Sequence, residues 1–187
     1  AVSCSASTQL CQSQVCHITR LDLASYGMAG SIPSEIGNLV VLSWLDMESN
    51  ALTGSIPSEV GDLVALELLV LDKNALIGSI PSEIGNLVAL TWLALDDGFL
   101  TGTVPRELGN LVKLETFTLY NNSFTGRIPG ELGDLKALRW ISGNANDFTG
   151  PIPREIGRLQ HLEHITLQNN RLTGHIDACF NRHLRAG

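Results

Sequence analysis

The chain has few bases, few aromatic residues and no long apolar run. Its 187 residues include 19 acids but only 12 lysines and arginines, which gives a formal net charge of −7. No apolar run approaches the roughly 18 residues that a membrane-spanning helix needs, so we expect no membrane segment in this chain. A nucleic-acid-binding protein would need a basic face, so the acidic balance also argues against a nucleic-acid partner.

The shortage of bases is confined to the first half of the chain. Residues 1–93 hold two bases, Arg20 and Lys73, against nine acids, whereas residues 94–187 hold ten bases and ten acids. Solubility explains this polarity at least as well as a function does. The first residues, Ala1 to Cys4, show neither a charged nor an apolar leader, so we expect a mature or trimmed form.

Against these absences stands a strict period of 24 residues. It is marked by prolines that each follow Ile or Val: Pro33, Pro57, Pro81, Pro105, Pro129 and Pro153. A fixed period of about 20–50 residues is typical of a solenoid, in which each unit buries its apolar face against its neighbours. The sequence therefore predicts a repetitive, elongated domain.

Each unit predicts a strand, a turn and a helical segment. Around Leu45 and Met47 the alternation of apolar residues predicts a short strand with one buried face. Asn50 closes the strand, and its amide can bond backbone groups of the turn; the equivalent residues are Asn74, Asn122, Asn146 and Asn170. Gly54 permits a tight bend. The Ser-Glu-Val-Gly stretch that follows predicts one helical turn, stopped by Gly61.

Two units depart from this pattern. Gly98 replaces the asparagine, and Gly143 replaces a core leucine. The missing side chain at Gly143 predicts a small void or a shifted strand. We interpret both changes as sequence drift in preference to a binding notch.

The frame L-x-x-L-x-L-x-x-N-x-L-T-G-x-I-P-x-x-I-G-x-L resembles the plant-type leucine-rich repeat. The resemblance implies the α/β class: a curved right-handed solenoid with a concave parallel β-sheet, short 3-10 or helical turns on the convex side, and a second short strand at L-T-G-x-I-P. It divides the chain into an N-terminal cysteine cap at 1–17, a solenoid of about seven turns at 18–177, and a C-terminal cap at 178–187 that is truncated.

Cysteine occurs only at the two ends, as is typical of stapled caps in an oxidising compartment. The spacing of Cys4 and Cys11 resembles the N-terminal cap pair of the family, and Cys11 with Cys16 is the alternative. Six strand spacings of about 4.8 Å separate the first and last strands, whereas a disulfide needs Cα atoms within about 7 Å. Cys179 therefore cannot reach the N-terminal cysteines within one monomer.

Outward strand positions of a solenoid stack into columns. The first column contains all three tryptophans on alternate turns and reads Arg20, Trp44, Leu68, Trp92, Thr116, Trp140, His164. Exposed aromatic and apolar residues mark interaction surfaces, although tryptophan can also simply cover a sheet. We predict a binding ridge whose members from this column are Trp44, Leu68, Trp92, Trp140 and His164 and whose members from the neighbouring columns are Asp46, Glu48, Asp72, Asp96 and Tyr120.

The acids beside this ridge predict a solvated or cation-attracting face. Paired carboxylates can act in acid–base catalysis, but these repeat with the solenoid and no pocket is implied around them. A calcium site is weakly indicated, and the histidines, including His164, do not form a metal set. We therefore expect no enzyme activity, no cofactor and no metal.

The resemblance implies a secreted or cell-surface recognition module that binds a protein or peptide ligand. Two alternatives remain. The tryptophans would stand about 9.6 Å apart, twice the strand spacing, which suits an extended polysaccharide. A row of Ser31, Ser55, Ser79 and Thr103 would suit adsorption to ice or another surface, although it ends at Arg127. Asn121 heads the only N-glycosylation triplet, and we predict a glycan there.

Overall fold

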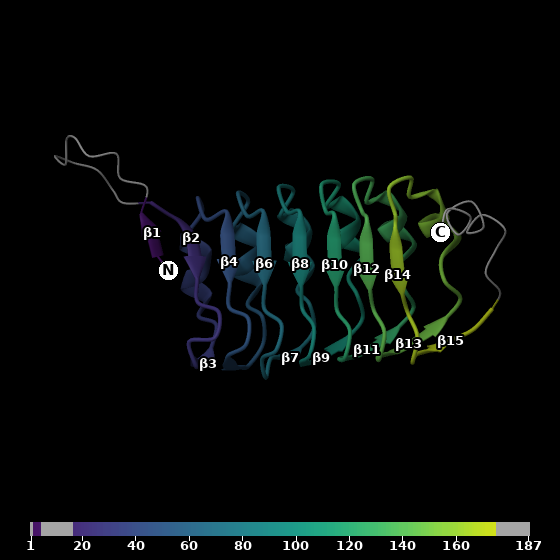
Figure 1. Cartoon of the computed structure of the whole chain (residues 1–187), viewed down its shortest axis with the longest axis horizontal. Coiled ribbons are helices and arrows are strands. Elements are labelled where there is room, and N and C mark those ends of the chain that lie inside the picture. The colour runs from purple at the N-terminus through teal and green to yellow at the C-terminus, as the bar shows by residue number, and fades with distance from the viewer. Residues whose placement is uncertain (1, 5–16, 175–187) are drawn as a thin grey trace.

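The computed structural model describes residues 2–4 and 17–174, which form one row of stacked turns (Figure 1). Eight strands make the concave sheet, in the order β1-β2-β4-β6-β8-β10-β12-β14. Their bounds are β1 Val2–Cys4, β2 Ile18–Asp22, β4 Trp44–Asp46, β6 Leu68–Val70, β8 Trp92–Ala94, β10 Thr116–Thr118, β12 Trp140–Ser142 and β14 His164–Thr166.

All strands from β2 to β14 pair in parallel, so the predicted parallel sheet is confirmed. Its register advances by one repeat at each step, as when Arg20 pairs with Trp44. The sequence pattern did not reveal β1, which pairs with β2 in the antiparallel sense.

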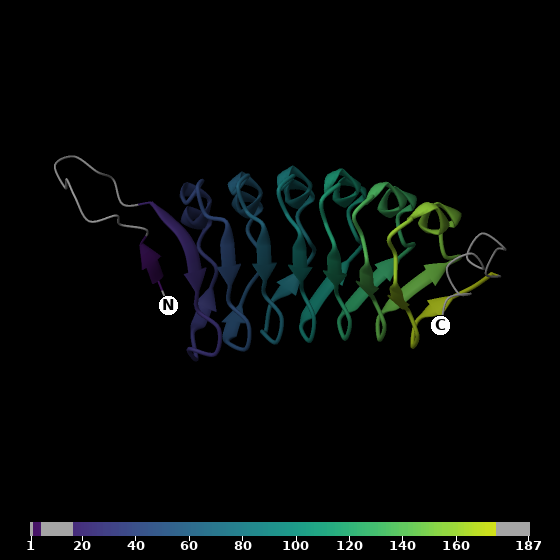
Figure 2. The same cartoon turned by 45° about the horizontal axis from the view of Figure 1, so that its top comes forward.

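Short strands and 3-10 turns complete each repeat. The second set of strands, expected at L-T-G-x-I-P, is present as β3 Ala29–Ser31, β5 Ala51–Thr53, β7 Ile77–Gly78, β9 Phe99–Gly102, β11 Ser123–Gly126, β13 Asp147–Gly150 and β15 Arg171–Leu172. The 3-10 turns are η1 Ser34–Asn38, η2 Ser58–Asp62, η3 Ser82–Asn86, η4 Arg106–Asn110, η5 Gly130–Asp134 and η6 Arg154–Arg158. Figure 2 shows the 3-10 turns stacked along the side of the solenoid away from the concave strands.

The core is a stack of leucine-rich layers. Leu45, Leu69 and Leu93 occupy the same inward position in successive strands and are fully buried. Burying each such side chain contributes about 1.5–3 kcal/mol, so the repeated pattern of apolar residues carries most of the stability. Among the described residues, no helix is long and apolar enough to cross a membrane.

The predicted asparagine ladder is confirmed. The Asn74 side-chain amide donates to the carbonyls of Met47 and Leu71 at 2.9 and 3.0 Å, and its oxygen accepts the Leu52 N–H at 3.0 Å. Asn50, Asn122, Asn146 and Asn170 repeat this arrangement. Each amide thus satisfies backbone groups of two adjacent turns, which would otherwise be left unpaired. The residue before each ladder asparagine, such as Lys73 with φ 53°, is left-handed.

The prediction that Gly61 stops its helical turn is wrong. The 3-10 turn continues to Asp62, and Gly61 lies within it. A Cβ at Gly61 would lie 2.5 Å from the carbonyl oxygen of Glu83 in the next repeat. Glycine is therefore present because adjacent 3-10 turns stack with their backbones in direct contact. By contrast Gly54, with φ 75°, makes the tight bend that was predicted.

The structure gives each irregular glycine a physical consequence. A void of about 10 Å³ adjoins Gly143 and confirms the predicted gap, while β12 keeps its register with β14. The Phe148 ring and the Leu167 side chain approach the position of the absent Cβ to 3.4 and 3.2 Å, so they fill most of the missing leucine volume. At Gly98 the ladder lacks a side-chain amide, so no amide oxygen accepts a hydrogen bond from the Leu76 N–H as Asn74 does from Leu52.

The predicted caps and cysteine pairings cannot be compared with the structure. Residues 5–16 and 175–187, which include Cys11, Cys16 and Cys179, lie outside the described residues, as does the side chain of Cys4. The domain limits at 17 and 178 and the Cys4–Cys11 pair therefore stay predictions.

Candidate functional site

The concave sheet aligns the tryptophans in one row. Its register places Trp44 beside Leu68, Leu68 beside Trp92, Thr116 beside Trp140, and Trp140 beside His164. Because side chains alternate between the two faces of a strand, all of these face away from the leucine core. The row predicted from the sequence is therefore present on the outward face of the sheet.

The three indole rings have different surroundings. The Arg20 guanidinium lies 3.7 Å from the centre of the Trp44 ring, and the rings of Trp140 and His164 lie 4.3 Å apart. Trp92 is 44 % exposed, and no cation or ring of the described residues stacks on it. Trp92 is therefore the ring most open to a partner.

A groove of about 970 Å³ runs along this face over β4 to β12. Its floor includes Val70 and Ala94, whose outward side chains are nevertheless buried. Nine of the ten predicted binding residues line it: Trp44, Asp46, Glu48, Leu68, Asp72, Trp92, Asp96, Tyr120 and Trp140. His164 is not among the lining residues, but its ring packs at a tilt against that of Trp140, which lines the groove.

Several lining residues were not among the predicted binding residues. The lining also includes residues at outward positions of their strands, which the alternation of side chains could have identified: Val70, Ala94, Thr116, Thr118 and Ser142. Glu67 and Thr91 precede their strands, and no feature of the repeat marks them.

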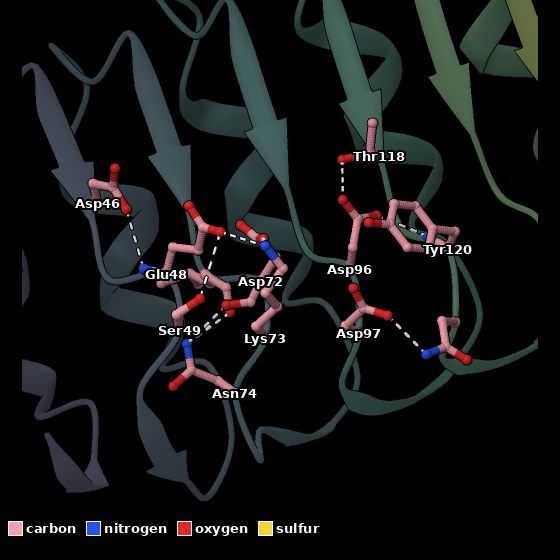
Figure 3. A network of polar contacts seen from close by, with 12 residues as sticks. Asp46, Glu48, Ser49, Asp72, Lys73, Asn74, Asp96, Asp97, Thr118 and Tyr120 are labelled. Carbon is pink, nitrogen blue, oxygen red and sulfur yellow. Dashed lines mark hydrogen bonds and ion pairs between the residues drawn. The ribbon is translucent and has the colours of Figure 1, made fainter. Parts of the chain in front are cut away.

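Asp96 is buried at the edge of this groove (Figure 3). Its carboxylate accepts hydrogen bonds from the Thr118 hydroxyl at 2.6 Å and the Tyr120 N–H at 2.8 Å. Burial raises the pKa of Asp96 to about 7, although these hydrogen bonds oppose the shift. The expectation of a solvated acidic face is therefore wrong at this position.

Asp72 lies on the neighbouring turn and is also buried. Burial, aided by the charge of Glu48, raises its pKa to about 6. Lys73 does not neutralise it closely, because the Lys73 ammonium donates to Glu48 at 2.6 Å and stays 3.9 Å from Asp72 (Figure 3). The groove thus holds two carboxylates on adjacent turns that are costly to ionise.

The predicted glycan acceptor Asn121 is exposed in the turn after β10. Its side-chain amide donates to Asp97 at 2.7 Å, and its backbone is left-handed, with φ 54°. Occupancy by a glycan stays a prediction. Elsewhere in the described part of the chain, no group of three or more His, Cys, Asp or Glu residues could hold a metal ion.

Comparison with known proteins agrees with this architecture. A family model described as a leucine-rich repeat region matches residues 2–149, and a second leucine-rich repeat model matches residues 161–182. The chain belongs to the leucine-rich repeat family. It is of the plant type found in extracellular receptor ectodomains, as the similar structures below indicate.

Leucine-rich repeat ectodomains of plant receptors are structurally similar to the chain. The ectodomain of GASSHO1/SCHENGEN3 from Arabidopsis thaliana, solved with CASPARIAN STRIP INTEGRITY FACTOR 2, is 34% identical over 97% of this chain, with a TM-score of 0.89. The PEPR1–AtPEP1 structure is 35% identical over 88% of this chain, with a TM-score of 0.87. The chain spans only 24% and 23% of those two proteins. A search of curated proteins gave no significant match.

Proposed function

We propose that this chain is a non-enzymatic, extracellular recognition module that binds a peptide or protein segment along its concave groove. The observation that carries the proposal is the groove itself, in which an open indole, Trp92, adjoins apolar residues and a few polar groups. Ligand sites commonly combine an apolar surface with a small number of polar groups that set orientation. Aromatic anchors near the centre of an interface contribute much of its binding energy.

The similar structures support this function and its location. The HAESA receptor kinase of Arabidopsis, solved with the peptide hormone IDA and the co-receptor SERK1, is 28% identical over 97% of this chain, with a TM-score of 0.76. Receptor ectodomains that carry peptides favour a secreted or cell-surface setting for this chain too. The raised pKa values of Asp72 and Asp96 do not require catalysis, because burial accounts for them.

For a carbohydrate ligand, the spacing of the tryptophans is favourable but the access to their ring faces is not. The tryptophans do recur on every second strand, which suits the repeat of an extended polysaccharide. A sugar-binding row, however, needs open ring faces, whereas Arg20 covers the Trp44 ring and the His164 ring packs at a tilt against the Trp140 ring. Adsorption to ice or another flat surface does not account for a groove on the concave face. We therefore favour a peptide over both.

Substitution of Trp92 tests the proposal. Peptides are first selected on the folded protein from a displayed random library and then titrated in synthetic form by fluorescence anisotropy. Trp92→Ala should weaken their binding by about 2 kcal/mol or more, as expected for a central aromatic anchor. It should leave unfolding within about 0.5 kcal/mol of the wild type, because the side chain is largely outside the core.

Glu131→Ala on the convex turn η5 is the control and should bind like the wild type. If the control lost binding while Trp92→Ala kept it, the concave groove would not be the site. If Trp92→Ala unfolded the domain, the tryptophan row would serve packing and not recognition.

A further inference from the structure

Asp72 brings to the groove a buried carboxylate whose hydrogen-bond donor is a backbone N–H and not a side chain. Asp72 is 8% exposed and lines the groove, yet no side chain among the described residues donates a hydrogen bond to it. Its nearest cation is the Lys73 ammonium at 3.9 Å, which is already bound to Glu48. The carboxylate therefore lacks a side-chain or cationic donor in close contact, and a ligand cation would add a charge-assisted hydrogen bond to it.

Asp96 brings a second carboxylate to the same place. It occupies the equivalent position one turn further along, about 4.8 Å away by strand spacing, and its charge and that of Asp72 affect each other. Both acids follow the strands β6 and β8 whose outward residues form the apolar part of the groove. A ligand on that apolar part would therefore lie beside both carboxylates.

The charge around the groove favours a cationic ligand group. Five of its lining residues are acidic and none is a lysine, arginine or histidine: the acids are Asp46, Glu48, Glu67, Asp72 and Asp96. A metal ion is not indicated, because no group of three ligating residues is gathered in the described part of the chain. The chain itself shows the kind of contact expected, since Arg20 places its guanidinium on the Trp44 ring while it pairs with Asp22 at 3.4 Å.

We propose that the groove selects a peptide in which an arginine or lysine adjoins an apolar residue. The cationic head lies against Asp72 and Asp96, and the apolar side chain lies on Trp92 and Leu68. An arginine offers several donors to two carboxylates at once and can stack on an aromatic ring. This inference names the ligand chemistry of the proposed peptide site and therefore rests on the proposed function.

The proposal also predicts that binding depends on pH. Charged or titratable groups near Asp72 are Asp46, Glu48, Lys73 and Asp96, and those near Asp96 are Asp72, Asp97 and Tyr120. The pKa values of about 6 and about 7 mean that both carboxyls become largely neutral as pH falls to about 5. A cationic group would then lose its attraction to the groove, so affinity should fall over that interval.

The test compares two pools of capped synthetic peptides. In one pool an Arg-Leu pair stands between random residues; in the other, citrulline, which has nearly the shape of arginine without its charge, replaces the arginine. Fluorescence anisotropy at about pH 8 should show the arginine pool binding at least tenfold more tightly, because charge-assisted hydrogen bonds are lost with citrulline. The preference should shrink severalfold at about pH 5.

Three variants that each remove one negative charge show where the arginine preference arises. Asp72→Asn and Asp96→Asn should each reduce the arginine preference severalfold, whereas Asp62→Asn at the end of η2 should not. Asp72→Asn is the decisive variant, because it removes no internal hydrogen bond from a side-chain donor and should fold normally. Circular dichroism and the unfolding midpoint verify that it does.

The outcomes separate this inference from the proposed function. Equal binding of both pools, with loss in Trp92→Ala, would keep peptide recognition and overturn the cationic preference. Failure of both pools to bind would overturn both. An arginine preference unaffected by Asp72→Asn and Asp96→Asn would place the cation elsewhere and overturn the inference. Saturable binding of Ca²⁺ alone that Asp72→Asn abolished would assign these acids to a metal and overturn it equally.

Discussion

Replacing Asp96 by asparagine should stabilise the protein at high pH while it impairs the proposed site. The reason is that Asp96 is buried and its pKa is raised to about 7 from 3.8. The neutral form is therefore favoured in the folded state. Stability from this neutral form is fully present below about pH 4, and it is lost as pH rises through about 7.

The size of the effect follows from the pKa difference. Each pKa unit corresponds to about 1.4 kcal/mol, so a rise of about three units sets an upper limit of about 4 kcal/mol at alkaline pH. We expect about half of this, about 2 kcal/mol, because the groove admits water near the carboxylate. An asparagine keeps both local hydrogen bonds: its oxygen can accept the Tyr120 N–H, and its amide can donate to the Thr118 hydroxyl.

Urea unfolding followed by tryptophan fluorescence measures the change. Asp96→Asn should raise the free energy of unfolding at about pH 8 and leave it nearly unchanged at about pH 3, where the wild-type carboxyl is largely protonated in both the folded and the unfolded state. Asp62→Asn is the matched control, because Asp62 is exposed. A loss of stability at pH 8, or the same gain at both pH values, would refute the argument that burial disfavours the ionised form. A variant that is more stable but binds less would indicate that Asp96 is kept for function.

Two further substitutions test the repeat itself. Gly98→Asn should raise the free energy of unfolding by about 1 kcal/mol, because it restores a ladder amide and removes a flexible glycine; a loss in urea unfolding would mean that the 3.0 Å approach of its Cβ to the Asn122 oxygen dominates. Gly61→Ala should cost about 2 kcal/mol, because its Cβ would meet the Glu83 carbonyl at 2.5 Å. Ser58→Ala in the same turn is the control and should change thermal unfolding little; an equally small effect of Gly61→Ala would contradict the stacking role.

The sequence alone determined the repeat architecture of this protein. A period of 24 residues with Leu45, Asn50, Gly54 and their equivalents at fixed offsets predicted the parallel sheet, the asparagine ladder and the tight bends. These features depend on local patterning and on stacking of identical units, so each repeat reports the same constraint. The tryptophan row was predictable for the same reason, since a column is the consequence of a constant period.

Only the tertiary structure decided how those columns behave. The sequence marked Asp72 and Asp96 as outward acids, yet the folded chain buries both. The sequence predicted that Gly61 ends its helical turn, whereas the structure shows that glycine is needed there because the next repeat approaches closely. Likewise only the folded chain places the Arg20 guanidinium on the Trp44 ring and the His164 ring against Trp140. Burial, interactions between charges and contacts between rings depend on the distances between side chains of neighbouring repeats. A periodic sequence fixes the order of the repeats but not these distances.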